Sequence, residues 1–564
     1  MDRASQIVKS FPQSRAGGNP PDPHDEDSRG TAMKPDLSKV LSRGLGSRPH
    51  AVAQLRKFSS RMLEPGVHAR FYRARKMFIL TVVSSAIGLG NLWRFPYVAY
   101  ENGGGAFLIP YLLALFTVGI PLLILETGVG YKTRSGPPLA FKRLLGRGYS
   151  VIGWAAVLVA FLIVTYYSVI VAWSFDYLGF SFSLAWGSDP SAFFYDDFLQ
   201  LSDGFFSISG LNLMVLAGAI LAWIWIYLSI FKGVRSVEKM VWVTVVVPWL
   251  LIIIFVLRGI TLPGAMDGLA YYLTPNFSAL LDPGVWIAAY GQVFYSMSIG
   301  MAIIIAYSRF LGEKSDVVKN AVFIAIADCF TSIFAGIAVF STLGYLAFTH
   351  GVSVTEVVRG GIELAFVTYP AVISALPVLP QLFGVLFFAM LITLGVGSAF
   401  SLVQAVSASL TDYVRAERWV LTGAICIAAF AVSLIYMTDA GILWLDIIDH
   451  YVNNFLILLV GFAEAAVIGY VYGAPKLREF VNRFSDWKVG RWWDVCIWVV
   501  IPLFLGLALI INVIDGIADP YGDYPLAANL LGWAEVVVLP LVAVVLAFVY
   551  RNHEGVDVDE QASE

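Results

Sequence analysis

The chain of 564 residues is 58% hydrophobic and only 14% charged, with a formal net charge of −3 and a mean hydropathy of +0.75. These values exclude a soluble globular protein and indicate an integral membrane protein. The three cysteines lie in apolar runs, so neither disulfides nor a metal site is indicated. No catalytic spacing of histidine or cysteine and no sizeable soluble domain is found, so an enzyme, an organic cofactor and a nucleic-acid partner are not expected.

The first 70 residues differ from the rest of the chain. Residues 1–70 are rich in Pro, Gly, Ser and both charges without periodicity, which predicts a disordered cytoplasmic N-terminal tail. No apolar core follows their basic residues, so a signal peptide is not predicted. The cluster of basic residues at 70–76 is read as an orientation signal, with contact to anionic membrane lipid as the alternative.

Twelve apolar runs follow, each about long enough to cross a bilayer. They cover 77–99, 105–130, 151–180, 211–231, 240–257, 285–308, 321–348, 382–410, 419–437, 452–472, 493–514 and 527–550. The fold class is therefore an all-α integral membrane protein with twelve transmembrane helices. We expect a membrane domain of residues 71–551, with spans 1–5 at about 77–257, spans 6–10 at about 285–472 and spans 11–12 at about 493–550. A short tail follows at 552–564.

Charged residues alternate between loops. Lysine and arginine gather after spans 2, 4, 6 and 10, whereas the opposite loops are acidic, with Asp189, Asp196, Asp197 and Asp203 before span 4. The positive-inside rule then places both termini in the cytoplasm. The absence of an extracellular cysteine pair and the short outer segments favour the plasma membrane of a prokaryote, that is, the inner membrane.

Spans 1 and 6 contain residues that interrupt an apolar helix. The first has SSAIGLGN at 84–91 and the sixth GQVFYSMSIGMA at 291–302. Five spans per unit would insert a second unit upside down, and discontinuous helices at matching places in inverted halves indicate a transporter's central site. Unwinding at Gly88–Gly90 and at Ser296–Gly300 would free carbonyls for a cation, with half-helix N-termini facing an anionic group. The alternative is that small residues merely allow close helix packing.

Four motifs carry a resemblance to a known family. The segment 84–111, SSAIGLGNLWRFPYVAYENGGGAFLIPY, closely resembles the first-helix signature of the neurotransmitter:sodium symporter family. GQVFYSMSIG in span 6, ADCFTSIFAG in span 7 and LITLGVGSAF in span 8 are similar to the family too, over roughly 70–550. The resemblance implies the LeuT-type fold, a 5+5 inverted repeat with helices 1 and 6 discontinuous. It also implies sodium-driven uptake of an amino acid or related small solute.

The resemblance implies two sodium sites and an anion-binding neighbourhood. The first sodium site would comprise Ala86, Asn91, Ser296 and Asp328, and the second would comprise Ser84, Ile87, Leu394, Gly397 and Ser398. The position equivalent to a chloride site would comprise Tyr111, Gln292, Ser296, Asp328 and Ser332. Asp328 stands where the family commonly has asparagine, so we expect its charge to replace the halide and transport to be independent of chloride. A protonated or hydrogen-bonded structural aspartate is the alternative.

The second sodium site departs from the family at Gly397, where a hydroxyl or carboxylate is usual. Three explanations stay open: a water fills the position, Ser84 contributes its hydroxyl, or the site is weak and the sodium stoichiometry falls. Sodium-independent proteins of this fold can place a basic side chain on span 5. The span-5 sequence VWVTVVVPWLLIIIF offers none, which favours retention of the ion.

The resemblance also implies the substrate contacts and two gates. The contacts would be Ala86, Gly88, Gly90, Ile163, Tyr167, Phe294, Tyr295, Ser298, Gly300, Met301, Ser398 and Leu402. Glycine at 88, where monoamine carriers have aspartate, leaves room for a ligand with its own carboxylate, so a neutral and apolar amino acid is expected. Arg94 and Asp449 match the outer gate, and Asp412 the inner one. The arginine that pairs with Asp412 is out of register, and we assign Arg70.

The sequence thus predicts a sodium-coupled symporter that alternates access around a site at mid-membrane. Its partners would be an amino acid, Na⁺ as the coupling ion and membrane lipid, and its oligomeric state is left open. Two alternatives remain: an amino-acid-binding sensor or partner subunit that does not transport, and a proton-coupled transporter that uses Asp328. The intramembrane carboxylates Glu101, Glu126 and Glu464 are expected to bond to unwound backbone or neighbouring helices and not to ions.

Overall fold

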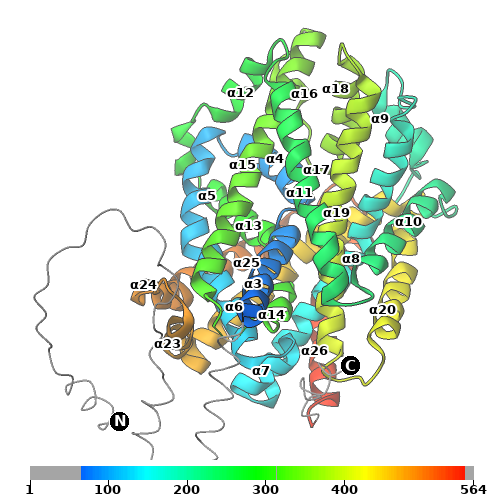
Figure 1. Ribbon diagram of the computed structural model, residues 1–564. Helices are drawn as coiled ribbons and strands as arrows, with labels where there is room; N and C mark the ends of the chain where they lie inside the picture. The colour runs from blue at the N-terminus through cyan, green and yellow to red at the C-terminus, as the bar shows by residue number, and fades with distance from the viewer. Residues whose placement is uncertain (1–64, 313, 553–564) are drawn as a thin grey trace, which may run out of the picture. The chain divides into compact units, whose positions relative to one another are not determined.

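The computed structural model describes residues 65–312 and 314–552, and within these residues the regular elements are all helices, joined by loops (Figure 1). Ten helices are long and apolar enough to cross a membrane, or eleven when the bent pair at 75–101 is counted as one span. These eleven coincide with eleven of the twelve predicted runs. The remaining run, 285–308, is divided between two helices that are each too short to span alone. The predicted tails fall almost entirely outside the described residues.

The first half of the membrane domain contains five predicted spans. They correspond to α3 (Pro65–Ala86) with η1 (Gly90–Arg94) and α4 (Phe95–Glu101), α5 (Leu108–Ala114) with α6 (Ile120–Thr133), α8 (Ser150–Phe180), α10 (Leu213–Ile230) and α11 (Val234–Gly259). Asn212 accepts hydrogen bonds from the first backbone N–H groups of α10, which explains why that helix begins there. Pro248 lies inside α11.

The second half contains the other spans. They correspond to α13 (Pro283–Ser296) and α14 (Ile303–Ser308), α15 (Val317–His350), α19 (Pro380–Leu410), α20 (Arg418–Ser433), α21 (Gly441–Tyr451) with α22 (Ile457–Ala466), α25 (Ile501–Ala518) and α26 (Leu526–Val549). Shorter helices lie between or beside the spans of both halves: α7 (Pro137–Leu145), α9 (Pro190–Ala192), α12 (Ala265–Leu273), α16 (Val354–Val357), α17 (Gly361–Glu363), α18 (Tyr369–Ala375), α23 (Ala474–Phe484) and α24 (Arg491–Val495).

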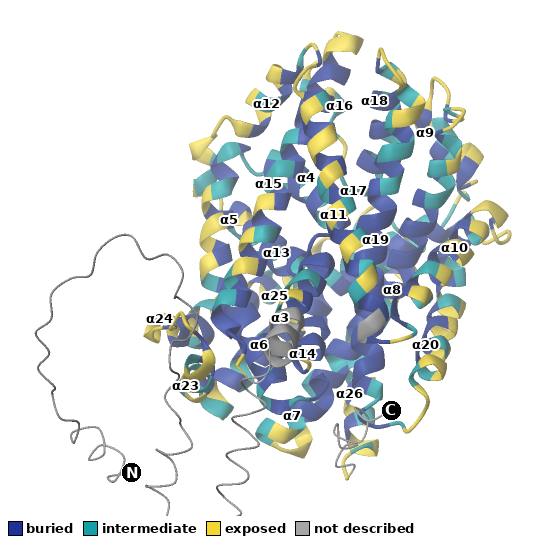
Figure 2. Cartoon of the chain, viewed as in Figure 1, coloured by how far each residue is buried: buried dark blue, intermediate teal, exposed yellow. Residues whose placement is uncertain are grey.

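Burial separates the central helices from the outer ones (Figure 2). In their most apolar stretches α8 is 78% buried and α19 72% buried, and the two helices pack against each other. The corresponding values for α25 and α26 are 17% and 22%, although these helices are equally apolar. Apolar side chains that face outward on a helix of this length are suited to lipid. Most of the polar residues predicted for the site lie on or beside the helices α3, α8, α13–α14, α15 and α19.

Candidate functional site

Two helices are interrupted where the sequence predicts unwinding. The segments Arg75–Ala86 and Gly90–Glu101 are bent by 50° at the break between them. The second interruption runs from Met297 to Ala302, between α13 and α14. Ser298, Gly300 and Ala302 all have left-handed backbone there, with φ of +54°, +74° and +63°. Non-glycine residues with such backbone are uncommon and concentrate at functional sites, because the surroundings must hold them there.

Glu126 of α6 holds the second interruption in place. Its Oε1 accepts a hydrogen bond of 2.8 Å from the backbone N–H of Gly300, and its side chain is fully buried. Glu464 of α22 is also fully buried and lies against Glu126. Glu101, by contrast, is exposed at the end of α4. Glu126 therefore satisfies a backbone donor that the broken helix leaves without a partner.

Residues predicted for the first sodium site are in direct contact. Asn91 Nδ2 donates to Asp328 Oδ1 at 2.7 Å and to Ser332 Oγ at 2.8 Å, and Ser296 Oγ donates to Asp328 Oδ2 at 2.8 Å. Asn91 Oδ1 accepts from the N–H of Gly88 at 3.0 Å. Asp328 is fully buried, and no ion pair to it occurs within residues 65–312 and 314–552. When Asp328 is ionised, its charge is compensated there by hydrogen bonds alone, an arrangement that would attract a cation.

The remaining residues of the chloride-equivalent group lie nearby. Tyr111 is fully buried close to Asp328, with its ring 4.9 Å from that of Phe95. The side-chain amide of Gln292 is buried, and neither of its polar atoms has a hydrogen-bond partner in the part of the chain that the structure describes. An unpartnered amide is costly in a membrane interior and is suited to a polar ligand or water.

The residues predicted for the second sodium site meet where α3, α11 and α19 come together. Ser398 Oγ donates to the carbonyl of Ser85 at 3.1 Å, which joins span 8 to span 1. Ser84 Oγ lies 2.7 Å from the hydroxyl of Thr244 on α11. Ile87 and Leu394 are buried there as well. Thr244 was not among the predicted ligands, because span 5 was expected to matter only if it carried a basic side chain in place of the ion.

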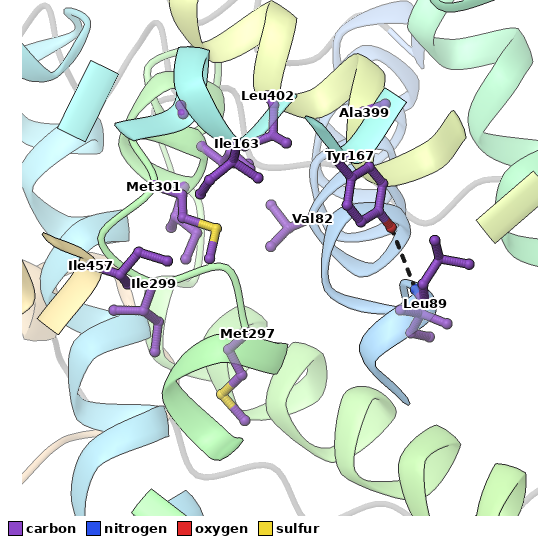
Figure 3. Packing of buried hydrophobic residues seen from close by; sticks show 14 of the residues in the cluster. Val82, Leu89, Ile163, Tyr167, Met297, Ile299, Met301, Ala399, Leu402 and Ile457 are labelled. Atoms are coloured by element: carbon purple, nitrogen blue, oxygen red, sulfur yellow. Dashed lines mark hydrogen bonds between the residues drawn. The ribbon is translucent and has the colours of Figure 1, made fainter. Parts of the chain in front are cut away.

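A small cavity of about 40 Å³ adjoins both interruptions. Ten predicted substrate contacts line it: Ala86, Gly88, Gly90, Ile163, Tyr167, Tyr295, Ser298, Met301, Ser398 and Leu402. Figure 3 shows Ile163, Met301 and Leu402 close together, and the Tyr167 hydroxyl 3.5 Å from the N–H of Leu89. Two predicted contacts are not in the lining, Phe294 and Gly300; the Phe294 ring instead packs against Gly461 of α22.

The lining also contains residues that sequence reasoning missed, namely Ser85, Leu89 and Ile303. Ser85 could have been found as the second member of the SSAIGLGN motif. Its hydroxyl lies 3.3 Å from that of Ser298, and its carbonyl accepts from Ser398. The cavity thus has polar backbone and hydroxyl groups at the interruptions and apolar side chains opposite, a combination suited to a small zwitterion with an apolar side chain.

The two residues predicted for the outer gate, Arg94 and Asp449, lie near each other. The Arg94 guanidinium lies 4.2 Å from the centre of the ring of Tyr295, which lines the cavity, and makes a cation–π contact with it. Asp449 is on α21, and the ion pairs found within the described residues do not include one between it and Arg94. A direct closing contact between these two residues therefore stays a prediction.

Asp412 has a different partner from the predicted one. Arg309, immediately after α14, lies 2.8 Å from Asp412 Oδ1 and donates to the carbonyl of Ala408 at 2.7 Å. The second carboxylate oxygen accepts from the N–H of Gly136 at 2.7 Å. The side chains of the ion pair are only 3% and 2% exposed. The side chain of Arg70 lies outside the described residues, so its pairing remains a prediction, whereas Arg309 occupies the carboxylate in this structure.

Comparison with known proteins finds a family whose model covers most of this chain. The model of the sodium:neurotransmitter symporter family matches residues 70–189 and 187–554. The chain belongs to the sodium:neurotransmitter symporter family. It is 41% identical over 471 residues to an uncharacterised sodium-dependent transporter of Methanocaldococcus jannaschii, covering 83% of this chain and 94% of that protein.

Two mouse members are more distant. The symporter is 31% identical to the sodium- and chloride-dependent neutral and basic amino acid transporter B(0+), over 83% of this chain and 84% of that protein. It is 33% identical to the sodium- and chloride-dependent GABA transporter 2, over 83% and 85%. The protein is therefore a multi-pass, sodium-dependent membrane transporter and not an enzyme.

Proposed function

We propose that this symporter couples the uptake of a neutral, apolar amino acid to sodium, independently of chloride. Three hydrogen-bonded residues, Asn91, Ser296 and Asp328, carry the proposal, because they bring a buried carboxylate to the edge of the substrate cavity. Oxygen ligands of this kind bind hard cations. A sodium ion here would lie beside the substrate carboxylate, so each would raise the affinity for the other.

The cavity supports the substrate class. Gly88 has no side chain to pair with an amine, and a Cβ there would fall 2.7 Å from Ser398 Oγ. The Tyr167 hydroxyl can donate to a carboxylate, while Ile163, Met301 and Leu402 would surround an apolar side chain. The mouse relative named as a neutral and basic amino acid transporter agrees with an amino-acid substrate.

Asp328 supports chloride independence. A chloride ion supplies one negative charge to balance the coupling cations, and a buried carboxylate at the same place supplies it permanently. The mouse relatives are named sodium- and chloride-dependent, whereas the archaeal relative is named sodium-dependent only. Chloride would in addition be repelled by this carboxylate, since both carry negative charge.

The architecture proposed with this function has twelve spans. The interrupted pair α13–α14 would cross the membrane as one span, and spans 1–5 and 6–10 would form the inverted repeat. Both termini would be cytoplasmic and the protein would reside in the plasma membrane, in agreement with the basic loops after spans 2, 4, 6 and 10.

A thermal-shift screen of the twenty amino acids identifies the substrate, because a ligand that binds the folded state raises the apparent stability. Proteoliposome uptake of that amino acid then tests the coupling. We expect uptake with a sodium gradient, none with potassium alone, and equal uptake when gluconate replaces chloride. A large drop in gluconate would refute chloride independence, and equal uptake in potassium would refute sodium coupling.

Proton coupling through Asp328 is the second candidate, favoured by the lack of an ion pair to this carboxylate in the described part of the chain. It predicts acid-stimulated uptake without sodium. Counterflow of labelled substrate tests the sensor alternative, since a protein that binds without transporting produces none. Asn91→Ala provides the residue-level test: it should weaken sodium and substrate binding together, measured by titration calorimetry.

A further inference from the structure

We propose that Thr244 of α11 supplies a ligand to the second sodium site, in place of the side chain that Gly397 lacks. The inference rests on the proposed sodium-coupled function and adds a third helix to this site. Its ligands would then come from α3, α11 and α19, whereas the expected set, Ser84, Ile87, Leu394, Gly397 and Ser398, involves spans 1 and 8 only.

The space beside Gly397 is already filled. A Cβ at Gly397 would fall 2.7 Å from Ser84 Oγ, 2.9 Å from the Ser84 carbonyl oxygen and 3.2 Å from Thr244 Cβ. Contacts below 3.0 Å to a backbone atom require the structure to shift. Glycine is therefore accommodated because Ser84 and Thr244 occupy the position where a side chain at 397 would lie.

The hydroxyl of Thr244 is oriented for such a role. It donates to the carbonyl of Met240 at 3.2 Å and lies 2.7 Å from Ser84 Oγ. When its proton goes to Met240, the oxygen lone pairs are available for the Ser84 proton or for a cation. Thr244 is fully buried, so its oxygen would otherwise have to be satisfied within the helices.

Pro248 adds a second feature at the same turn. Proline has no N–H, so the carbonyl of Thr244, four residues earlier, cannot receive its regular helical hydrogen bond. Thr244 thus combines a backbone carbonyl that lacks its helical hydrogen bond with a hydroxyl that lies against Ser84 of α3. Neutral oxygens of this type are the ligands that discontinuous membrane helices offer to sodium.

The physical consequence concerns alternating access. A sodium ion held by α3, α11 and α19 would tie span 5 to the other two helices, and its release would free all three. The hydroxyl group of Thr244 would then couple the binding of the ion to the movement of span 5. A Thr244 ligand would replace all three explanations left open for Gly397, since neither a water, nor Ser84 alone, nor a weakened site would be needed.

The test is a sodium titration of purified, full-length protein without substrate, read out by thermal stability and by equilibrium binding of radioactive sodium. Thr244→Val removes the hydroxyl at nearly constant volume, and Thr244→Ser keeps it. Ser84→Ala breaks the same hydroxyl–hydroxyl contact but leaves Thr244 intact. Thr342→Val is the matched control, since Thr342 is also buried and its hydroxyl donates to carbonyls of its own helix.

We expect Thr244→Val to raise the half-saturating sodium concentration about tenfold or more, as for the loss of an oxygen that contacts a charge. Thr244→Ser and Thr342→Val should titrate within about threefold of the wild type, and Ser84→Ala should raise the half-saturating sodium concentration less than Thr244→Val does. If Thr244→Val titrates with sodium like the wild type, the inference is overturned. It is also overturned if only Ser84→Ala loses sodium affinity, because that result assigns the role to Ser84. A wild type that does not respond to sodium would instead refute the proposed function.

Discussion

Breaking the ion pair of Arg309 and Asp412 should open the inner side of the transporter. Arg309→Gln leaves Asp412 with the N–H of Gly136 as its partner at that carboxylate. Removing one partner of a buried ion pair costs about 3–5 kcal/mol. Taking about 3 kcal/mol, and about 1.4 kcal/mol for each factor of ten, the closed arrangement loses roughly a hundredfold in population relative to the open one.

Hydrogen exchange of the Gly136 amide measures this directly, because that amide is protected only while it is bonded to Asp412. Peptides covering 134–141 and 405–412 should exchange faster in Arg309→Gln with sodium present, and Arg309→Lys should be intermediate, since lysine keeps the charge but not the planar fork. Substrate efflux should rise in parallel.

Arg478→Gln is the matched control. Arg478 pairs with Asp494 at 2.9 Å between α23 and α24, with side chains 19% and 4% exposed, away from the substrate cavity. This variant should leave exchange at 134–141 unchanged. If peptide 134–141 exchanges as slowly in Arg309→Gln as in the wild type, the ion pair of Arg309 and Asp412 does not hold the inner side closed. Arg70→Ala should leave this peptide protected if Arg309 is the sufficient cation, and faster exchange in Arg70→Ala would show that Arg70 contributes.

Three further predictions concern the substrate site. Gly88→Ala should weaken substrate binding about tenfold at unchanged thermal stability, because the added methyl group lies 2.7 Å from Ser398 Oγ; equal calorimetric affinity would contradict this. Glu126→Leu should cost about 1–3 kcal/mol of stability by leaving the Gly300 N–H unpaired, whereas Glu126→Gln, which can still accept, should cost less; equal melting temperatures would exclude this role. Asp328→Asn should make uptake dependent on chloride by removing the fixed charge, and equal uptake in gluconate would disprove it.

The sequence alone was sufficient for the membrane class, most spans and the interruptions. Apolar runs of bilayer length predict helices because backbone groups in lipid must be paired internally. Clustered glycine and serine at 84–90 and 296–300 predict where that pairing fails. The grouping of Asn91, Ser296 and Asp328, which lie on three different spans, was anticipated from the family resemblance of their motifs.

Only the tertiary structure decided which distant groups complete these sites. Arg309 and Thr244 lie in stretches with no distinguishing motif, and their roles arise because α14 ends beside Asp412 and α11 packs against Gly397. A missing side chain at one position is compensated by a neighbour from another helix, and such compensation depends on interhelical packing at the scale of a single Cβ atom. Local sequence specifies a helix and its breaks, whereas three-dimensional packing selects the partner.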